Sequence, residues 1–524
     1  MAYFQLLRLD WALPSLGFLL IIYLRSLFAW KARIRGRPFP PGPTLLPVVG
    51  YFDMPKVKPW FAFSGMRNRY GDVVYFRRLG QHNLILGSPA VITEYLEKRA
   101  ANTSDRVVSP SIALSALDET LGFMPYAPEW KDCRRAFWQH FHPGALGAYK
   151  DVQVAVARRF LLKLLRTPAG FEQHIRFTFA ATVLKISYGI DIEDENNEIV
   201  RVIEKAMEGP SQTIVPGKFL VDYVPLLRYV PGWVPGAGFQ AQFAEWRDAT
   251  RKLKDLPYAQ RNTAFTDNVL PYCVPIVEAL LSAKGDLEGY PSGMPQDEVV
   301  KTVAGAAYIA GSDTTYSTLQ AAFLAMSLYP DVQKKAQAEL SAVVGPSRLP
   351  DFDDRDALVY VNAVVKETLR WFNVTPLGIS HRTVEDDEFH GYFIPAGTMV
   401  TPNIWACMHD PEEYEDPDEF RPERFIRDGK LDPNVRDPLA FVFGFGRRCV
   451  VICPGRYFAD AALFINVASV LHVFDIGPPL DEKGDPIHVK MEMSDGFLSY
   501  PVDRRCTIRP RSEAAAALIL NAQS

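Results

Sequence analysis

Apolar residues at helical spacing dominate the chain. They recur through three long stretches, Asp151–Leu165, Gln296–Tyr329 and Leu358–Phe372. The second stretch is several times longer than an ordinary helix of about 11–12 residues. Short strand-like pieces occur at "DVVYFRRL" and "NLILGS" and again from Thr383 onward, where Gly391 marks a turn. The pattern predicts a mainly α fold with small β-sheets.

A long apolar stretch, Trp11–Trp30, lies near the start of the chain, and Arg25 is its only charged residue. Its length matches the roughly 20 residues that cross a bilayer, and Arg25 lies near the end, where a long side chain reaches the interface. Basic residues follow at once, in "KARIRGR", and the positive-inside rule then places the remaining chain on the cytoplasmic side. We predict a membrane anchor with a basic flank over residues 1–37. A buried first helix of a soluble protein is the alternative.

A proline-rich segment follows this flank. "RPFPPGPTLLPVVG" carries prolines that cannot continue a helix and that favour a stiff, extended chain. We therefore predict a hinge over residues 38–50. Beyond it there is no low-complexity run, no repeat and no second boundary, so residues 38–524 are expected to form one domain.

The composition is that of a globular protein, with 48% hydrophobic and 23% charged residues. A chain of 524 residues can bury a large core and still enclose a ligand cavity. The net charge of -4 and the lack of a basic stripe make nucleic acid an unexpected partner. Six scattered cysteines do not form a secreted disulfide framework, which favours a reduced, cytosol-facing location.

The longest helical stretch contains "AGSDTT", Ala310–Thr315. Gly311 and Ser312 are weak helix formers, and the polar side chains of Asp313 and Thr314 can bond to the backbone and open the helix there. An acid beside an alcohol suits the binding of a small polar ligand and the relay of protons. An ordinary helix with a polar patch is the alternative.

Two further motifs carry charges. "KETLRW" places Glu367 and Arg370 three residues apart, where a helix allows an ion pair. "FRPERF" adds Arg424 among aromatic residues. If Arg424 joined the pair, the result would be a buried charged network, which is costly unless every group is satisfied. Its value would lie in fixing geometry rather than in stability.

The most specific motif is "FGFGRRCVVICPGRYFAD", Phe443–Asp460. Its glycines and aromatics suit a tight turn close to a flat ligand, and a helix is expected from about Gly455. A thiolate just before a helix start is stabilised by backbone N–H groups, as a metal ligand requires. The spacing of Cys449 and Cys453 lacks the second Cys/His pair of a zinc site, and a disulfide between them is not expected in the cytosol.

Together these motifs resemble the cytochrome P450 family of haem-thiolate monooxygenases, and particularly its membrane-bound fungal members. The resemblance covers nearly the whole chain, with the motifs in the family's order: the apolar anchor, "PPGP", "WKDCRR", "AGSDTT", "ETLR", "PERF" and "FGFGRR…CPGR". It implies the cytochrome P450 fold preceded by an N-terminal transmembrane helix, and heme b as cofactor.

The resemblance also implies which cysteine holds the iron. The family's ligand is a cysteine followed by x-Gly, a pattern that Cys453 and Gly455 meet. Cys449 does not meet it, because Val450 and Val451 follow. Cys453 is therefore the expected axial ligand of heme b.

The remaining roles are carried over by motif position. Asp313 and Thr314 would deliver protons to bound dioxygen. Three expected cofactor-binding residues, Trp130, Arg134 and His381, would hydrogen-bond to the haem propionates. Arg448 is a further expected cofactor-binding residue. The expected structural residues supporting the proximal face are Glu367, Arg370 and Arg424.

The loop departs from the family's pattern at one point. The family has one residue between the second arginine of "GRR" and the ligand, whereas Cys449–Ile452 intervene here, and removal of "CVV" would restore the pattern. Three extra residues add roughly 10 Å of extended chain. The insert bulges outward with Cys453 still the ligand, or Cys449 takes over, or haem binds poorly. We favour the first outcome because the helix side of Cys453 is intact.

The implied activity is insertion of one oxygen atom of dioxygen into a lipophilic small molecule, in secondary metabolism, with electrons from NADPH through NADPH-cytochrome P450 reductase. The implied location is the endoplasmic reticulum membrane, as a single-pass protein with its catalytic domain facing the cytoplasm. The segments Asn102–Tyr126 and Tyr229–Phe239 suit a pocket wall and a membrane contact, and both favour a substrate that arrives from the bilayer. The alternatives are an inactive, haem-poor homologue and a reductase-independent relative that rearranges peroxides, against which "SDTT" argues.

Overall fold

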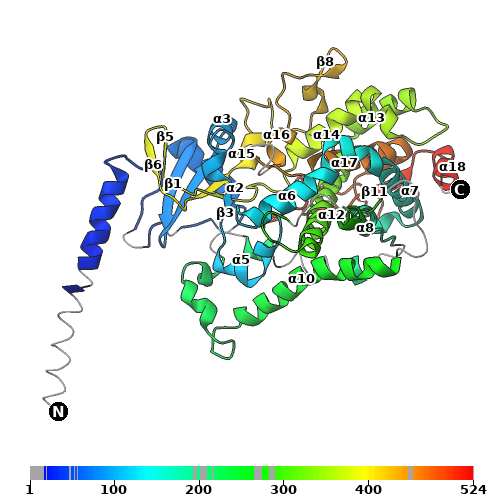
Figure 1. Ribbon diagram of the computed structural model, residues 1–524. Helices are drawn as coiled ribbons and strands as arrows, with labels where there is room; N and C mark the ends of the chain where they lie inside the picture. The colour runs from blue at the N-terminus through cyan, green and yellow to red at the C-terminus, as the bar shows by residue number, and fades with distance from the viewer. Residues whose placement is uncertain are drawn as a thin grey trace.

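A computed structural model of the chain shows a small β-rich region at one side and a large helical region at the other (Figure 1). The structure describes residues 17–18, 21–46, 49–51, 53–55, 57–192, 198–200, 209, 211–214, 218–264, 274–282, 290–446 and 452–522. In Figure 1 the first helical residues project from the β-rich side, and the C-terminus lies at the far end of the helical region.

The helices expected from the sequence form close to their predicted bounds. The stretches at Asp151, Gln296 and Leu358 become α7, α12 and α14, and the helix expected from about Gly455 begins at Arg456 as α17. The α-helices with both ends in the described part of the chain are α2 Pro59–Tyr70, α3 Pro89–Ile92, α4 Ala100–Thr103, α5 Pro110–Leu114, α6 Pro128–Phe141, α7 Lys150–Arg166, α8 Phe171–Tyr188, α10 Phe239–Ala264, α11 Ile276–Ser282, α12 Gln296–Leu328, α13 Pro330–Val343, α14 Val359–Trp371, α15 Ile404–Met408, α16 Leu439–Val442, α17 Arg456–Val473 and α18 Glu513–Asn521.

Short helices of one or two turns connect several of these elements. They are η1 Thr93–Glu97, which is a π-helix, and the 3₁₀-helices η2 Leu117–Glu119, η3 Pro143–Tyr149, η4 Pro168–Gly170, η5 Leu220–Asp222, η6 Pro225–Tyr229, η7 Phe352–Ala357 and η8 Pro422–Phe425. Tight turns of this kind suit connections between packed elements.

In the described part of the chain, the strands form one five-stranded sheet, in the order β1-β2-β7-β4-β3, and three two-stranded sheets, β5-β6, β8-β9 and β10-β11. The bounds are β1 Val73–Arg78, β2 Gln81–Leu86, β3 Asp105–Arg106, β4 His381–Arg382, β5 Asp387–Phe389, β6 Tyr392–Ile394, β7 Met399–Pro402, β8 Ile426–Arg427, β9 Lys430–Leu431, β10 Phe474–Gly477 and β11 Thr507–Pro510. The sheet brings β3 next to β4, so the segment after Thr103 lies beside His381. The prediction of a mainly α fold with small sheets is confirmed.

The long helix α12 runs through the centre of the helical region (Figure 1). It packs against α6, α8, α10 and α17, and most of its side chains from Val299 to Ser327 are buried. A helix surrounded by protein needs apolar residues on nearly all sides, which explains its weak amphipathicity.

The polar "AGSDTT" segment does not open this helix as the sequence analysis expected. Residues 296–328 are α-helical without a break. Instead, the hydroxyls of Ser312, Thr314 and Thr315 donate to the carbonyls of Tyr308, Ala310 and Gly311 one turn earlier. Hydroxyls that bond back in this way add to the helical ladder rather than replacing it.

No helix within the described part of the chain is long and apolar enough to cross a membrane. Part of the predicted anchor, Trp11–Trp30, lies outside the described residues, since residues 11–16 and 19–20 are not described. Residues 21–34 are helical, and apolar side chains such as Ile21, Leu24 and Phe28 are exposed on them.

This helix is docked against the β-rich region at its C-terminal end. Trp30 stacks on His82 of β2, with ring centroids 5.7 Å apart, and contacts Phe393 of β6 edge-on at 6.2 Å. Arg33 forms an ion pair with Asp386, and Arg37 lies 3.4 Å from a carboxylate oxygen of Glu388. Aromatic stacking and charge together therefore hold the helix against the β-rich region.

The predicted hinge is bonded to the β-rich region as well. The carbonyl of Pro38 accepts from the N–H of Phe393, and that of Pro41 accepts from the N–H of Tyr75. Gly42 lies so close to β1 that a Cβ atom there would be 1.8 Å from the carbonyl oxygen of Tyr75. Only glycine allows this approach.

The substitution Gly42→Ala is therefore expected to lower the free energy of unfolding by about 1–3 kcal/mol, the usual penalty for overpacking. Gly65→Ala is the matched control, because Gly65 lies in α2 with open space around its Cα. That change should stabilise the protein by about 0.5–1 kcal/mol. Urea unfolding of both variants measures the two effects, and a loss at Gly65 equal to that at Gly42 would contradict the steric explanation.

Candidate active site

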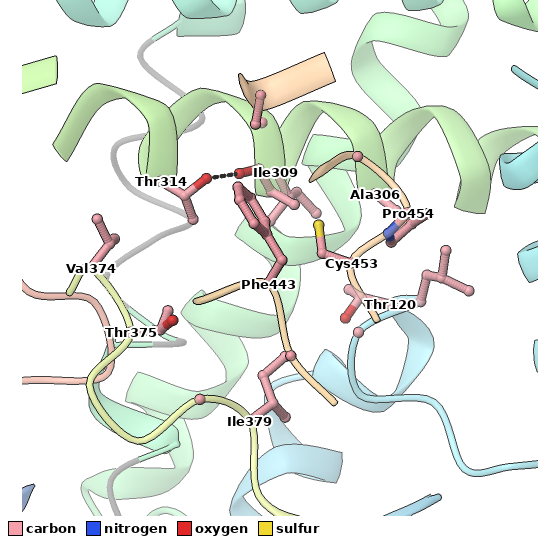
Figure 2. A pocket seen from close by; sticks show the side chains of 18 of the residues that line it. Thr120, Ala306, Ile309, Thr314, Val374, Thr375, Ile379, Phe443, Cys453 and Pro454 are labelled. Carbon is pink, nitrogen blue, oxygen red and sulfur yellow. Dashed lines mark hydrogen bonds between the residues drawn. The ribbon is translucent and has the colours of Figure 1, made fainter. Parts of the chain in front are cut away.

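A large cavity of about 350 Å³ lies between α12 and the loop that precedes α17. Most of its wall is apolar, and it is built from segments that are far apart in the sequence. Figure 2 shows the labelled side chains around it: Thr120, Ala306, Ile309, Thr314, Val374, Thr375, Ile379, Phe443, Cys453 and Pro454. A mainly apolar cavity of this kind suits a flat hydrophobic cofactor together with a lipophilic ligand.

The thiol of Cys453 points into this cavity, toward α12 (Figure 2). The backbone N–H of Cys453 donates to the carbonyl of Phe443 at 2.7 Å, and α17 begins three residues later. Burial raises the pKa of the thiol, while the Gly455 N–H and the charges of Arg134 and Arg456 act against that rise. A cation bound at the sulfur is needed to hold the thiolate form at neutral pH.

Thr314 faces the cavity across from Cys453, and its hydroxyl donates to the carbonyl of Ala310 at 2.6 Å (Figure 2). Asp313 does not line the cavity. Its side chain is 2% exposed and lies on another face of α12, toward α8 and Tyr500. Neighbouring residues on a helix point about 100° apart, so an acid and an alcohol adjacent in sequence face different surroundings.

Trp130 and Arg134, both on α6, line the cavity. The indole N–H of Trp130 donates to the carbonyl of Leu121 at 3.1 Å. The guanidinium of Arg134 donates to the carbonyl of Ile452, the residue before Cys453. Arg134 thereby ties α6 to the loop that carries the thiol.

Arg106 is a cavity residue that the sequence analysis missed. It lies on β3 and donates to the carbonyls of Ile379 and Ser380 at 2.7 and 3.2 Å. Burial and the like charge of Arg134 lower its pKa to about 10. Two arginines that repel each other in an apolar wall provide a site for anionic groups. One feature of the sequence could have indicated this role: Arg106 is the single basic residue within Asn102–Tyr126, the segment that was expected to line the pocket.

His381 lies beside this arginine pair, on β4, and lines the cavity. Its Nδ1 bonds to the carbonyl of Thr103 at 2.7 Å, so Nδ1 carries the proton. Burial, with the nearby charge of Arg106, lowers the pKa of His381 to about 3. The neutral ring therefore offers an acceptor at Nε2, and it can donate to a propionate only after taking up a second proton.

The structure brings Glu367, Arg370 and Arg424 together. Arg370 donates to both carboxylate oxygens of Glu367 at 2.8 Å, and Arg424 donates to one of them at 3.1 Å. The backbone N–H of Arg421 adds a fourth donor at 2.8 Å. Glu367 and Arg370 are fully buried. Both guanidiniums also donate to backbone carbonyls within 408–419, so the network joins α14 to this irregular segment.

Two predicted features fall outside the described residues. Arg448 and the Cys449–Val451 insert both lie within residues 447–451, of which the structure describes nothing. On either side, Phe445 is buried and Ile452 is bonded to Arg134.

The residues that surround the cavity fit a haem. One thiol faces α12 across an apolar space, and two arginines stand in the wall where two carboxylates would compensate their charge. A porphyrin bears two propionates, and a cysteine thiolate is one of the axial ligands of haem iron. The charges and the lining therefore suit this group.

Comparisons with known proteins agree with this geometry. The family model for cytochrome P450 matches residues 40–501. The cytochrome P450 monooxygenase COX2 of Coprinopsis cinerea is 40% identical over 93% of this chain and 92% of its own. A cytochrome P450 monooxygenase of Armillaria gallica is 39% identical over 96% of this chain and 97% of its own. The tryptamine 4-monooxygenase of Psilocybe cyanescens is 37% identical over 93% and 96%.

A family match over most of the chain, a helical fold with small sheets and a thiol beneath a long central helix define an oxidoreductase of the haem-thiolate class. The chain belongs to the cytochrome P450 family, and the relatives named above are fungal monooxygenases.

The buried network around Glu367 gives a test of the site's framework. Glu367→Ala leaves two buried arginines without their carboxylate and should destabilise the protein by about 3–5 kcal/mol. The control is Glu119→Ala, which removes an exposed ion pair with Arg251 and should cost less than about 1 kcal/mol. Urea unfolding of haem-loaded protein measures both. Equal, small losses would show that the network contributes little to the fold.

Proposed function

We propose that this protein is a monooxygenase in which Cys453 is the axial ligand of heme b. The single observation that carries the proposal is the Cys453 thiol, which points into an apolar cavity opposite Thr314 with Arg106 and Arg134 in the wall. Residues 38–524 form the catalytic domain, with the hinge at 38–50 and the membrane anchor in 1–37.

The chain's own residues would bind and orient the cofactor. Arg106 and Arg134 lie where they can pair with propionates, and the indole of Trp130 lines the same wall. His381 can join them once a nearby carboxylate favours its charged form, because an anion raises the pKa of an adjacent imidazole. Arg448 is the remaining cofactor-binding residue of the proposal.

When bound, a thiolate-ligated haem supplies electron density that favours cleavage of the O–O bond. Thr314 holds its hydroxyl on the cavity face of α12, where it can pass a proton toward the space above Cys453. Asp313, which lies outside the cavity on another face of α12, supplies that proton. Glu367, Arg370 and Arg424 fix the segment beneath the site.

The proposed reaction inserts one oxygen atom of dioxygen into a lipophilic molecule in secondary metabolism. Its electrons come from NADPH through NADPH-cytochrome P450 reductase. The proposed location is the endoplasmic reticulum membrane, with the catalytic domain facing the cytoplasm. Exposed apolar residues on helix 21–34 and at Leu226, Tyr229 and Trp233 support a membrane surface as neighbour.

The charge of the cavity narrows the substrate class. Its lining, as far as the chain is described, contains no aspartate or glutamate, and its two arginines are matched by the propionates of the proposed cofactor. An ammonium group buried there would lack a partner, which is unfavourable. The Psilocybe relative is named for an amine, and aliphatic amines are cationic at neutral pH. We propose an uncharged substrate for this chain.

The ligand assignment is tested by Cys453→Ser and Cys449→Ser. Cys453→Ser should abolish the red-shifted Soret band of the reduced carbon monoxide complex, because that band requires a thiolate. Cys449→Ser should retain it. The reverse result would move the axial ligand to Cys449, and purified wild-type protein without any Soret band would support an inactive homologue.

The substrate class is tested with two isosteric probes, tert-butylbenzene and phenyltrimethylammonium. The cation has no lone pair and cannot bind iron, so the probes differ only in charge. Spectral titration of haem-loaded protein should show at least about tenfold tighter binding of the neutral probe, a difference of about 1.4 kcal/mol. Thr375 lines the cavity. Thr375→Glu should reduce the difference in affinity between the two probes, whereas Thr375→Gln should leave it unchanged. Equal affinities in the wild type would contradict an uncharged substrate.

A further inference from the structure

A small space, here called the side recess, adjoins the main cavity between α10 and α12. Four residues, Thr120, Thr250, Ala306 and Ile309, line both spaces. Figure 2 labels three of them, Thr120, Ala306 and Ile309, around the main cavity. The volume of the side recess is about 20 Å³. Because a space of roughly 10–15 Å³ holds one water molecule, the side recess accommodates a single oxygen-bearing group.

Two threonines face each other across this recess. The helices α10 and α12 approach closely at Gly305, where a Cβ atom would lie 3.5 Å from the Cα atom of Lys254. Thr250 lies one helical turn before Lys254 on α10, and Thr302 lies three residues before Gly305 on α12. Residues at these spacings share a helix face, so both threonines lie on the facing sides of the two helices, and both line the side recess.

The hydroxyls of Thr250 and Thr302 are buried and bond to none of the described residues. Thr250 is 5% exposed and Thr302 is 3% exposed. The threonines of α12 that line only the main cavity differ, since Thr314, Thr315 and Thr318 each donate to a carbonyl one turn earlier. A buried hydroxyl without a partner is unfavourable, and it points to an outside group that supplies the hydrogen bond.

The charged side chains around the side recess are paired with carboxylates. Arg251 donates to both carboxylate oxygens of Glu119, at 2.6 and 3.3 Å. Lys254 lies 2.9 Å from one carboxylate oxygen of Glu298, and Lys301 lies 3.5 Å from the other. Each of these cations therefore has its counter-ion in the protein. The recess favours a neutral polar group over an ion, because an ion buried there would lack a partner.

The side recess is far from the thiol end of the cavity. In Figure 2 the central helix runs from Thr314 past Ile309 to Ala306. Thr314 and Ala306 are eight residues apart on α12, and a rise of 1.5 Å per residue makes this about 12 Å along the helix axis. A ligand with one end above Cys453 and the other end in the side recess is therefore about this long.

We propose that the side recess binds a hydroxyl group that the substrate already carries, at the end remote from the reacting carbon. Thr250 and Thr302 are the specificity-determining residues of this subsite. A hydroxyl group donates one hydrogen bond and also accepts, so the substrate hydroxyl can donate to one threonine and accept from the other. This inference rests on the proposed function and narrows its substrate class to an uncharged lipophilic alcohol about 12 Å long.

The experiment uses two matched series of probes on haem-loaded full-length protein. One series is the 1-alkylimidazoles from hexyl to dodecyl, and the other carries a terminal hydroxyl on the same chains. The imidazole nitrogen binds haem iron, so the chain length sets how far the terminal group reaches. Spectral titration gives the dissociation constant of each probe.

The hydroxyl should weaken binding for chains that end against the apolar wall, because it lacks a partner there. At the chain length that reaches the side recess, the alcohol should instead bind about fivefold or more tightly than the alkyl probe, since a hydrogen bond changes an equilibrium by about two- to tenfold. A terminal carboxylate that binds more tightly than the alcohol at this length would overturn the proposal of a neutral group.

Variants show whether the two threonines supply the bonds. Thr250→Val and Thr302→Val keep the shape of the side chain but remove the hydroxyl, and each should abolish the preference for the alcohol at that chain length. Thr250→Ser and Thr302→Ser should retain it. Thr318→Val is the matched control, because Thr318 lines the main cavity with its hydroxyl already bonded to the carbonyl of Thr314 at 3.0 Å, and it should leave the preference unchanged. A preference that survives in both valine variants would overturn the proposal.

The same titrations separate this inference from the proposed function. A spectral change with every alkyl probe but no chain length at which the alcohol binds more tightly would overturn this inference alone. A protein whose absorption responds to none of the imidazoles would contradict haem binding, and would overturn the proposed function together with the side recess as a substrate subsite.

Discussion

The buried carboxylate of Glu367 is the interaction on which the position of the site depends. It receives four hydrogen bonds, from two guanidiniums and one backbone N–H, and so fixes α14 to the irregular segment that follows α15. The same helix packs against α12, α16 and α17. Since α16 leads directly to Phe443, whose carbonyl holds the N–H of Cys453, the network and the thiol belong to one rigid assembly. A buried carboxylate that accepts four hydrogen bonds favours a single geometry over the many that apolar packing alone would permit.

Much of this framework could be predicted from the sequence, because it depends on local patterns. Helical periodicity located α7, α12 and α14 to within a residue or two, and the Cys-Pro-Gly motif placed a thiol just before a helix start. The contact of Glu367 with Arg370 follows from a spacing of three on one helix. The participation of Arg424 was only a conditional expectation, because it depends on how the chain folds back over more than fifty residues.

Other features could not be predicted, since they depend on contacts between distant segments. The sequence gives Asp313 and Thr314 as neighbours but does not say that one faces Tyr500 and the other the cavity. Arg106 enters the site because β3 pairs with β4, and the proton on His381 is placed by a carbonyl of Thr103. The expected opening of α12 did not occur, because its hydroxyls bond to carbonyls of the same helix instead of competing with them.

The stack of Trp30 on His82 has a mechanical consequence. A helix joined to a domain by a loose linker can tilt without moving the domain. The helix at residues 21–34 is instead held against β2 by stacked rings and against Asp386 by an ion pair, so the two would move together. The strand β2 pairs in parallel with β7, and β7 in turn pairs with β4, the strand that bears His381. A change in the tilt of residues 21–34 would thus shift these three adjacent strands and, with them, His381 in the cavity wall.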